Sequence, residues 1–125
     1  MIVVDTSALI DSLTGPKRSG PILYSLVREG TRLLMPALVL YEWLRGPRTA
    51  EELAVQEALF PSEAALPFGA GDAALSARLY RTLRHPRGRE IDLAIAACAL
   101  NRTAELWTLN RGDFADIPAL KLLAR

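Results

Sequence analysis

One uninterrupted apolar stretch constrains the fold of this 125-residue chain more than any other feature. Residues 90–100 predict a helix, and its last eight residues, 93–100, include no polar side chain. A helix that is apolar nearly all round must be buried on every side, so we expect it at the centre of the protein. A membrane span needs ~20 apolar residues. This helix is therefore expected in a protein core and not in a bilayer.

Short strand-like and helix-like segments alternate along the rest of the chain. Strands are predicted at residues 2–4, 32–35 and 105–109, with a further edge strand at 120–123. Helices are predicted at residues 8–13, 19–28, 36–46, 50–59 and 73–83. This alternation implies right-handed crossovers and a parallel sheet covered on both faces. We predict an α/β fold in which residues 1–125 form a single three-layer α/β/α domain with a mostly parallel central sheet.

The composition excludes several functional classes. One Cys and one His rule out a disulfide framework and a Cys-based or paired-His zinc site, and they favour a reducing cytoplasmic setting. The apolar start of the chain is too short for a signal peptide. The net charge of +1 does not by itself indicate a nucleic-acid-binding protein. All cations except Lys17 and Lys121 are Arg, which suits contacts with phosphate, although genome composition or a hot habitat explains this equally well.

Four acidic residues are candidates for a shared site: Asp5, Glu42, Asp92 and Asp113. Asp5 directly follows the first predicted strand, and Asp113 comes shortly after the strand at 105–109. Ligands of open α/β sheets bind beyond the carboxyl ends of the strands, so we expect these two acids at one edge. Glu42 lies beside the apolar face of its helix, and Asp92 begins the central helix. Two further residues are candidates in the last segment: Asn110 as a neutral oxygen donor and Asp116 as a substitute for Asp113.

Each acid also has a purely structural explanation. Asp5 could cap the following helix, and Glu42 could pair with Arg45 three residues later. The helix dipole favours an acid such as Asp92 in a first turn, and Asp113 lies among typical turn residues. These alternatives stay open on the sequence alone.

Converging carboxylates repel one another, and a hard divalent cation removes that repulsion. Oxygen ligands favour Mg²⁺ or Mn²⁺ over Zn²⁺, and such an ion can align a phosphodiester and activate water. With these four acids set aside, 15 Lys and Arg face ten acids, so the site would be an acidic hollow in a basic surface. Arginines near the predicted site elements could then steer a polyanion such as RNA, unless they are merely solvated: Arg45, Arg48, Arg89 and Arg111.

Four segments resemble the motifs of a known family. Val3-Val4-Asp5-Thr6-Ser7-Ala8-Leu9-Ile10 is similar to the opening of PIN-domain ribonucleases, and more narrowly of VapC-type toxins of type II toxin–antitoxin systems. The segments at 41–46, 88–100 and 108–114 resemble the family's second, third and fourth acidic motifs, in order and across nearly the whole chain. The chain departs from the pattern at one point, where Thr108-Leu109-Asn110 stands in place of the common Thr-Arg-Asn.

The resemblance implies Mg²⁺- or Mn²⁺-dependent RNA cleavage, a homodimer and inhibition by a small cognate antitoxin. It implies that Asp5 and Asp92 are the principal metal ligands, that Glu42 and Asp113 complete the pocket, and that Thr6 or Ser7 forms hydrogen bonds within it. Two alternatives remain. One is a catalytically silent protein-binding domain of the same fold. The other is a receiver-type phosphoacceptor domain, which would want a second acid beside Asp5 and a Lys near the last strand.

Overall fold

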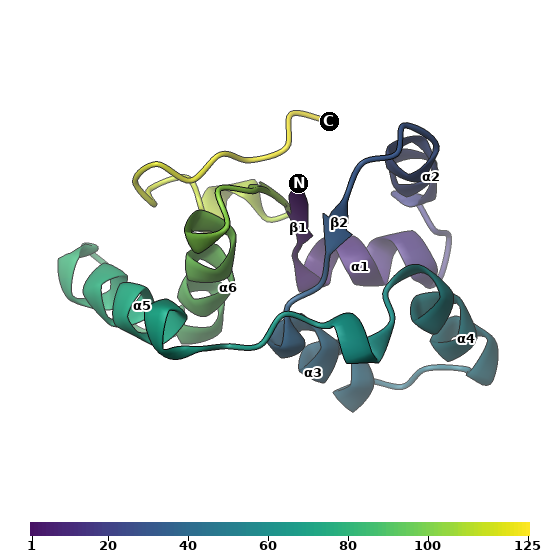
Figure 1. Ribbon diagram of the computed structural model, residues 1–125, viewed down its shortest axis with the longest axis horizontal. Helices are drawn as coiled ribbons and strands as arrows, with labels where there is room; N and C mark the ends of the chain where they lie inside the picture. The colour runs from purple at the N-terminus through teal and green to yellow at the C-terminus, as the bar shows by residue number, and fades with distance from the viewer.

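The computed structural model describes residues 1–125, and at its centre lies a three-stranded parallel sheet with the strand order β2-β1-β3 (Figure 1). The strands are β1 (Ile2–Val4), β2 (Leu33–Leu34) and β3 (Glu105–Trp107). The predicted parallel sheet is confirmed, although β2 and β3 are shorter than the sequence suggested. The predicted edge strand at 120–123 is wrong: the C-terminal segment forms only one parallel bridge, between Leu106 and Leu122. Two backbone hydrogen bonds join this segment to β3, from the Leu106 N–H to the Lys121 carbonyl and from the Leu123 N–H to the Leu106 carbonyl.

Helices cover both faces of this sheet, as the three-layer prediction requires. In Figure 1, α5 and α6 lie on one side of the strands and α1, α2 and α4 on the other. Two helices begin earlier than predicted. The first starts directly after Asp5, and α5 starts after Gly69 because the Asp72 carboxylate accepts a hydrogen bond from the Gly69 N–H (3.0 Å). The helices are α1 (Thr6–Leu13), α2 (Gly20–Arg28), α3 (Ala37–Arg45), α4 (Ala50–Leu59), α5 (Ala70–Thr82) and α6 (Glu90–Asn101), with short 3₁₀ turns at η1 (Ser62–Ala64) and η2 (Arg111–Asp113).

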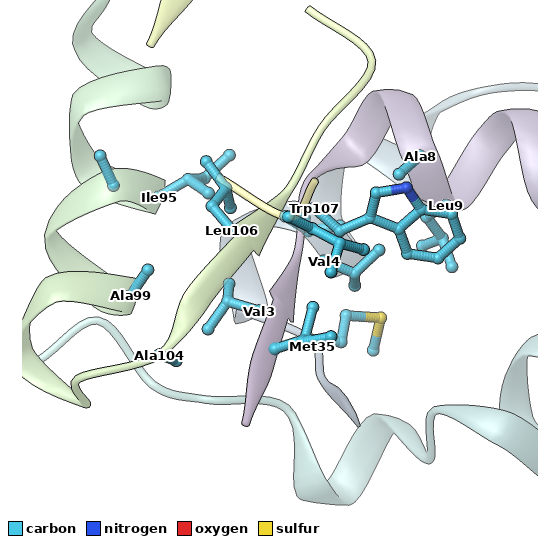
Figure 2. Close-up of a cluster of buried hydrophobic side chains, with 14 of the residues drawn as sticks. Val3, Val4, Ala8, Leu9, Met35, Ile95, Ala99, Ala104, Leu106 and Trp107 are labelled. Carbon is cyan, nitrogen blue, oxygen red and sulfur yellow. The ribbon is translucent and has the colours of Figure 1, made fainter. Parts of the chain in front are cut away.

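The central position predicted for the apolar helix is confirmed. Residues 93–99 of α6 are all buried. This helix packs against α5, α3, β1 and β3. Ile95 and Ala99 face the strands, where Val3 and Leu106 meet them, and Trp107 extends the same cluster toward α1 (Figure 2). None of the helices combines the length and apolarity needed to span a membrane.

The parallel pairing of β1 with β3 fixes where the two strands end. Val4 lies opposite Trp107, and the Asp5 N–H donates a 2.9 Å hydrogen bond to the Trp107 carbonyl. The next residues, Asp5 and Thr108, therefore leave the sheet side by side. This places the first candidate acid and the segment leading to Asp113 at the same edge, as the strand order predicts.

A buried ion pair joins α5 to α6 at a distance from this edge. Asp72 is 5% exposed, and its Oδ1 accepts hydrogen bonds from Asn101 (2.8 Å) and Arg102 (3.2 Å). Burial raises the pKa of Asp72, but the bonds from Asn101, the Gly69 N–H and Arg102 outweigh it, so the pKa is lowered overall. The ionised form of this carboxyl therefore stabilises the contact between the two helices.

We expect Asp72→Ala to lower the free energy of unfolding by about 2–4 kcal/mol at pH 7, because Arg102 and two donors lose a buried partner. The folded-state pKa is depressed, so this contribution is present above about pH 4 and is lost as the pH falls through the folded-state pKa. Urea denaturation between pH 7 and pH 3 measures it, with the exposed Glu63→Ala as the control. An unchanged difference across that range would contradict the assignment.

Candidate active site

Asp5 is buried, and its carboxylate is held by two hydroxyl groups. Its Oδ2 accepts hydrogen bonds from Ser7 Oγ (2.9 Å) and from Thr108 Oγ1 (2.7 Å). Asp5 occupies the position before α1, but its side chain makes no capping hydrogen bond. The structural explanation as a helix cap is therefore wrong. The two hydroxyls fix one carboxylate oxygen and leave Oδ1 without a protein donor.

Thr108 was not among the residues singled out from the sequence. Besides holding Asp5, its Oγ1 accepts the Asn110 N–H (3.0 Å), and Ser7 Oγ accepts the Leu109 N–H (3.0 Å). The hydroxyls thus tie the segment after β3 to the start of α1. A sequence signal existed, since Thr108 follows its strand as Asp5 follows β1. The side chain of Asn110 is exposed and makes no hydrogen bond in the structure.

Glu42 comes from α3, in the layer beside α1. Its Oε1 accepts a 2.6 Å hydrogen bond from Thr6 Oγ1, which links residues 36 positions apart in the sequence. Its Oε2 pairs with Arg45 at 3.4 Å, as the structural explanation expected. The bond from Thr6 is the additional feature, because Thr6 is the neighbour of Asp5. Thr6 and Ser7 thus orient one candidate acid each.

Asp92 lies in the first turn of α6 and is half-buried, and its carboxylate accepts no hydrogen bond in the structure. Burial raises the pKa of Asp92 to about 6, and the negative charges of Asp5, Asp113 and Glu42 contribute to the increase. The positive charge of Arg89 opposes it. The three other candidate acids are thus near enough to repel Asp92. The charges of the other three candidate acids therefore act on Asp92.

Asp113 and Asp116 differ in their partners. Asp113 lies in η2, is exposed, and adds to the repulsion of Asp92. Asp116 instead forms a two-bond ion pair with Arg89 (2.7 and 3.0 Å). Its charge is therefore already neutralised by a protein partner, whereas that of Asp113 is not.

The four arginines predicted to contact RNA have different surroundings. Arg48 packs over the Trp43 ring at 4.3 Å and donates to the Trp43 carbonyl (2.9 Å). Arg111 donates to the carbonyl of Leu123 (2.6 Å), and Arg89 is held by Asp116. The side chain of Arg45 is 59% exposed, and its one hydrogen bond is the long contact with Glu42 at 3.4 Å. Arg45 is therefore the one of the four most available to a ligand.

A divalent metal ion fits the chemistry of this donor set. The candidate ligands are all carboxylates, one oxygen of Asp5 lacks a donor, and Asp92 is a repelled carboxylate without any partner. No three of the His, Cys, Asp and Glu side chains lie as close together as the ligands of one ion. A receiver-type site fits poorly, because Lys121 lies beside Met1 and Glu105 at the other end of the strands.

Comparisons with known proteins show the family of this chain. Residues 2–120 match the PIN domain family. The chain is 32% identical over 123 residues to Ribonuclease VapC19 of Mycobacterium tuberculosis, covering 97% of this chain and 98% of the relative. The chain therefore belongs to the PIN-domain family, and the fold predicted from the sequence is that of its relatives.

Solved structures also share the fold of this chain. VapBC-1 from nontypeable Haemophilus influenzae superposes with a TM-score of 0.75 at 24% identity, covering 98% of this chain and 97% of that one. VapBC2 from Rickettsia felis, bound to a DNA fragment from its promoter, gives 0.74 at 20% identity, with 98% of each chain covered. FitAcB from Neisseria gonorrhoeae gives 0.72 at 20% identity, with 98% and 97% covered.

Asp92→Asn should stabilise the metal-free protein at pH 7.5. The folded-state pKa of Asp92 is raised, so the wild type loses stability as the pH rises through about 6. Because water screens this half-buried carboxylate, we expect a gain on the order of 1 kcal/mol, which disappears below about pH 4. Chemical denaturation in chelator measures it.

The matched control is Glu90→Gln, which removes an exposed acid two residues earlier on α6. It should leave the stability unchanged. Mn²⁺ should stabilise the wild type and the Glu90→Gln protein but not Asp92→Asn, because only the first two retain the proposed ligand. A destabilising Asp92→Asn substitution in chelator would contradict the repulsion described above.

Proposed function

We propose that this protein is a Mg²⁺- or Mn²⁺-dependent endoribonuclease and the toxin of a type II toxin–antitoxin module. The observation that carries the proposal is that the adjacent residues Thr6 and Ser7 hold the carboxylates of Glu42 and Asp5 after the end of β1. The raised pKa of Asp92 supports it, since the charges of Asp5, Asp113 and Glu42 contribute to that increase. Family membership supports the same reaction class, since the relative at 32% identity is named a ribonuclease. A cytoplasmic location belongs to the proposal and fits the single buried free thiol, Cys98.

In the proposed mechanism, Asp5 and Asp92 hold the ion and Glu42 and Asp113 complete the pocket. A bound divalent cation supplies activation of water and neutralisation of charge on the phosphodiester. Ser7 and Thr108 orient Asp5, and Thr6 orients Glu42, so that these carboxylates are placed before substrate arrives. Attack by water would form a new P–O bond and break the P–O3′ bond, and a proton from the water would end on the leaving O3′. The products are a 5′-phosphate and a 3′-hydroxyl.

The RNA would reach the site over a surface where Arg45 is the most available cation. Arg45 lies over the Tyr41 ring at 5.4 Å and beside Glu42. Its fork of donors suits a phosphate of the substrate strand, and the exposed ring of Tyr41 offers a stacking surface for a base. We assign weaker direct roles to Arg48, Arg89 and Arg111, because their guanidinium groups already have partners within the protein.

The antitoxin would bind an apolar hollow between α2 and α4. Tyr24 and Val27 line this hollow, and their hydrophobic side chains are 64% and 45% exposed. A hollow of this kind accepts the apolar face of a partner helix. Its apolar lining comes from Leu13, Leu23, Tyr24, Val27, Val55 and Leu59. The homodimer implied by the family resemblance remains part of the same proposal.

The proposal predicts that the purified protein cleaves single-stranded RNA with Mg²⁺ or Mn²⁺ and stops when a chelator is added. Asp5→Asn should lower the rate at least about a hundredfold. Loss of a carboxylate weakens binding of the divalent cation and so removes the charge stabilisation that the cation supplies. Gel analysis of end-labelled RNA measures the rate and identifies the product ends. The Glu90→Gln protein is the control and should cleave at the wild-type rate.

Two results would contradict the proposal. Chelator-insensitive cleavage, or an Asp5→Asn protein as active as the wild type, would remove the metal site from the reaction. A folded wild type that neither binds Mn²⁺ nor cleaves RNA would favour the catalytically silent protein-binding domain instead.

A further inference from the structure

The side chain of Arg89 bridges two segments that carry candidate ligands. It precedes α6, three residues before Asp92, and it is only 19% exposed. One of its terminal nitrogens donates to the Asp113 main-chain carbonyl at 2.8 Å and to Asp116 at 2.7 Å. The other donates to Asp116 at 3.0 Å and to the His85 carbonyl at 3.3 Å. Three of these contacts join the residue before α6 to Asp113 and Asp116, and the fourth joins it to His85.

The backbone around Arg89 is itself fixed by a turn. The Arg89 N–H donates to the Pro86 carbonyl at 3.0 Å, and Gly88 between them has φ +84°, a conformation that favours glycine. A rigid turn limits the directions in which the guanidinium can point. The planar fork of Arg then matches the Asp116 carboxylate with two parallel bonds, which a Lys side chain cannot make.

Apart from Arg89, the segment at 110–116 is anchored by the buried ring of Phe114, which belongs to the same core cluster as the apolar residues of α6. Residues 110–116 contain η2 and the exposed side chain of Asp113. At its beginning this segment is tied to α1 through Thr108 and Ser7, as described above. The Arg89 contacts to the Asp113 carbonyl and to Asp116 fix its far half against the helix that carries Asp92.

We propose that Arg89 is a positioning residue that, with Asp116 as its counter-ion, clamps residues 110–116 to the start of α6 and so sets the placement of Asp113 relative to Asp92. The effect of this clamp on metal binding and on RNA cleavage rests on the proposed function. This role differs from the contact with RNA expected from the sequence. It also gives Asp116 a task other than that of a substitute ligand.

Two other roles for Arg89 make different predictions for the metal. If Arg89 acted only through its positive charge, its removal would tighten the binding of a cation to the neighbouring carboxylates, and Arg89→Lys would change nothing. If Arg89 bound RNA phosphates, substitution would raise KM for RNA and leave Mn²⁺ binding alone. In that case Asp116→Ala would free the guanidinium and lower KM. Only the clamp predicts weaker Mn²⁺ binding in both Arg89→Lys and Asp116→Ala.

The test is isothermal titration of each full-length protein with Mn²⁺ in the absence of RNA, followed by cleavage kinetics. We expect Arg89→Lys and Asp116→Ala each to raise the Kd for Mn²⁺ about tenfold, the effect typical of residues that orient metal ligands. The kcat should fall while KM for RNA changes little. Arg102→Lys is the control, because it weakens another ion pair, to Asp72, away from the site. It should leave Kd unchanged.

Hydrogen exchange provides a readout that does not depend on activity. The clamp predicts faster exchange of the amides in residues 110–116 in both variants, with α6 protected as in the wild type. Unchanged exchange there, or an unchanged Kd for Mn²⁺ in an active background, would overturn the role of Arg89. A wild type that neither binds Mn²⁺ nor cleaves RNA would overturn the proposed function itself, which separates the two failures.

Discussion

The parallel pairing of β1 with β3 is the constraint on which the rest of the site depends. Because Val4 lies opposite Trp107, Asp5 and Thr108 leave the sheet together, and a hydroxyl from one strand end reaches the carboxylate of the other. The apolar packing of α6 against these strands brings Asp92 to the same edge. Core packing and like-charge repulsion therefore oppose each other there. The buried helix α6 keeps the Asp92 carboxylate close to other carboxylates that repel it.

Three hydroxyl groups and the Arg89 guanidinium stabilise these carboxylates in part. Ser7 and Thr108 both donate to one oxygen of Asp5, and Thr6 donates to one oxygen of Glu42. Arg89 lies near enough to offset some of the charge on Asp92. These contacts orient the acids but do not neutralise the set, since a hydroxyl carries no charge. A divalent cation is the group that would complete the balance. The repulsion between carboxylates lowers the stability of the protein when no ion is bound, and the same repulsion favours the binding of a divalent cation.

The fold could be predicted from the sequence for identifiable physical reasons, whereas the four acids stay a prediction. A long apolar stretch that begins with acidic residues favours a buried helix, and alternating strands and helices leave few topologies open. What the sequence could not supply were the contacts between distant side chains. The bond from Thr108 to Asp5 spans 103 positions, and the pairing of Arg89 with Asp116 spans 27. Both depend on register and rotamer choices that local patterns do not encode. The false edge strand at 120–123 arose in the same way, because an apolar run does not reveal how long it follows its neighbour.

The central claim is that the oxygens of Asp5 and Asp92 meet around one divalent cation. Anomalous X-ray diffraction from crystals grown with Mn²⁺ tests it most directly, because it locates the ion without reference to activity. We expect an anomalous peak at the carboxyl edge of the sheet, with Asp5 Oδ1 and an Asp92 oxygen within ~2.5 Å, the range of oxygen ligands to hard divalent cations. A crystal that shows no Mn²⁺ at this edge, or shows it bound to neither carboxylate, would contradict the proposed metal site.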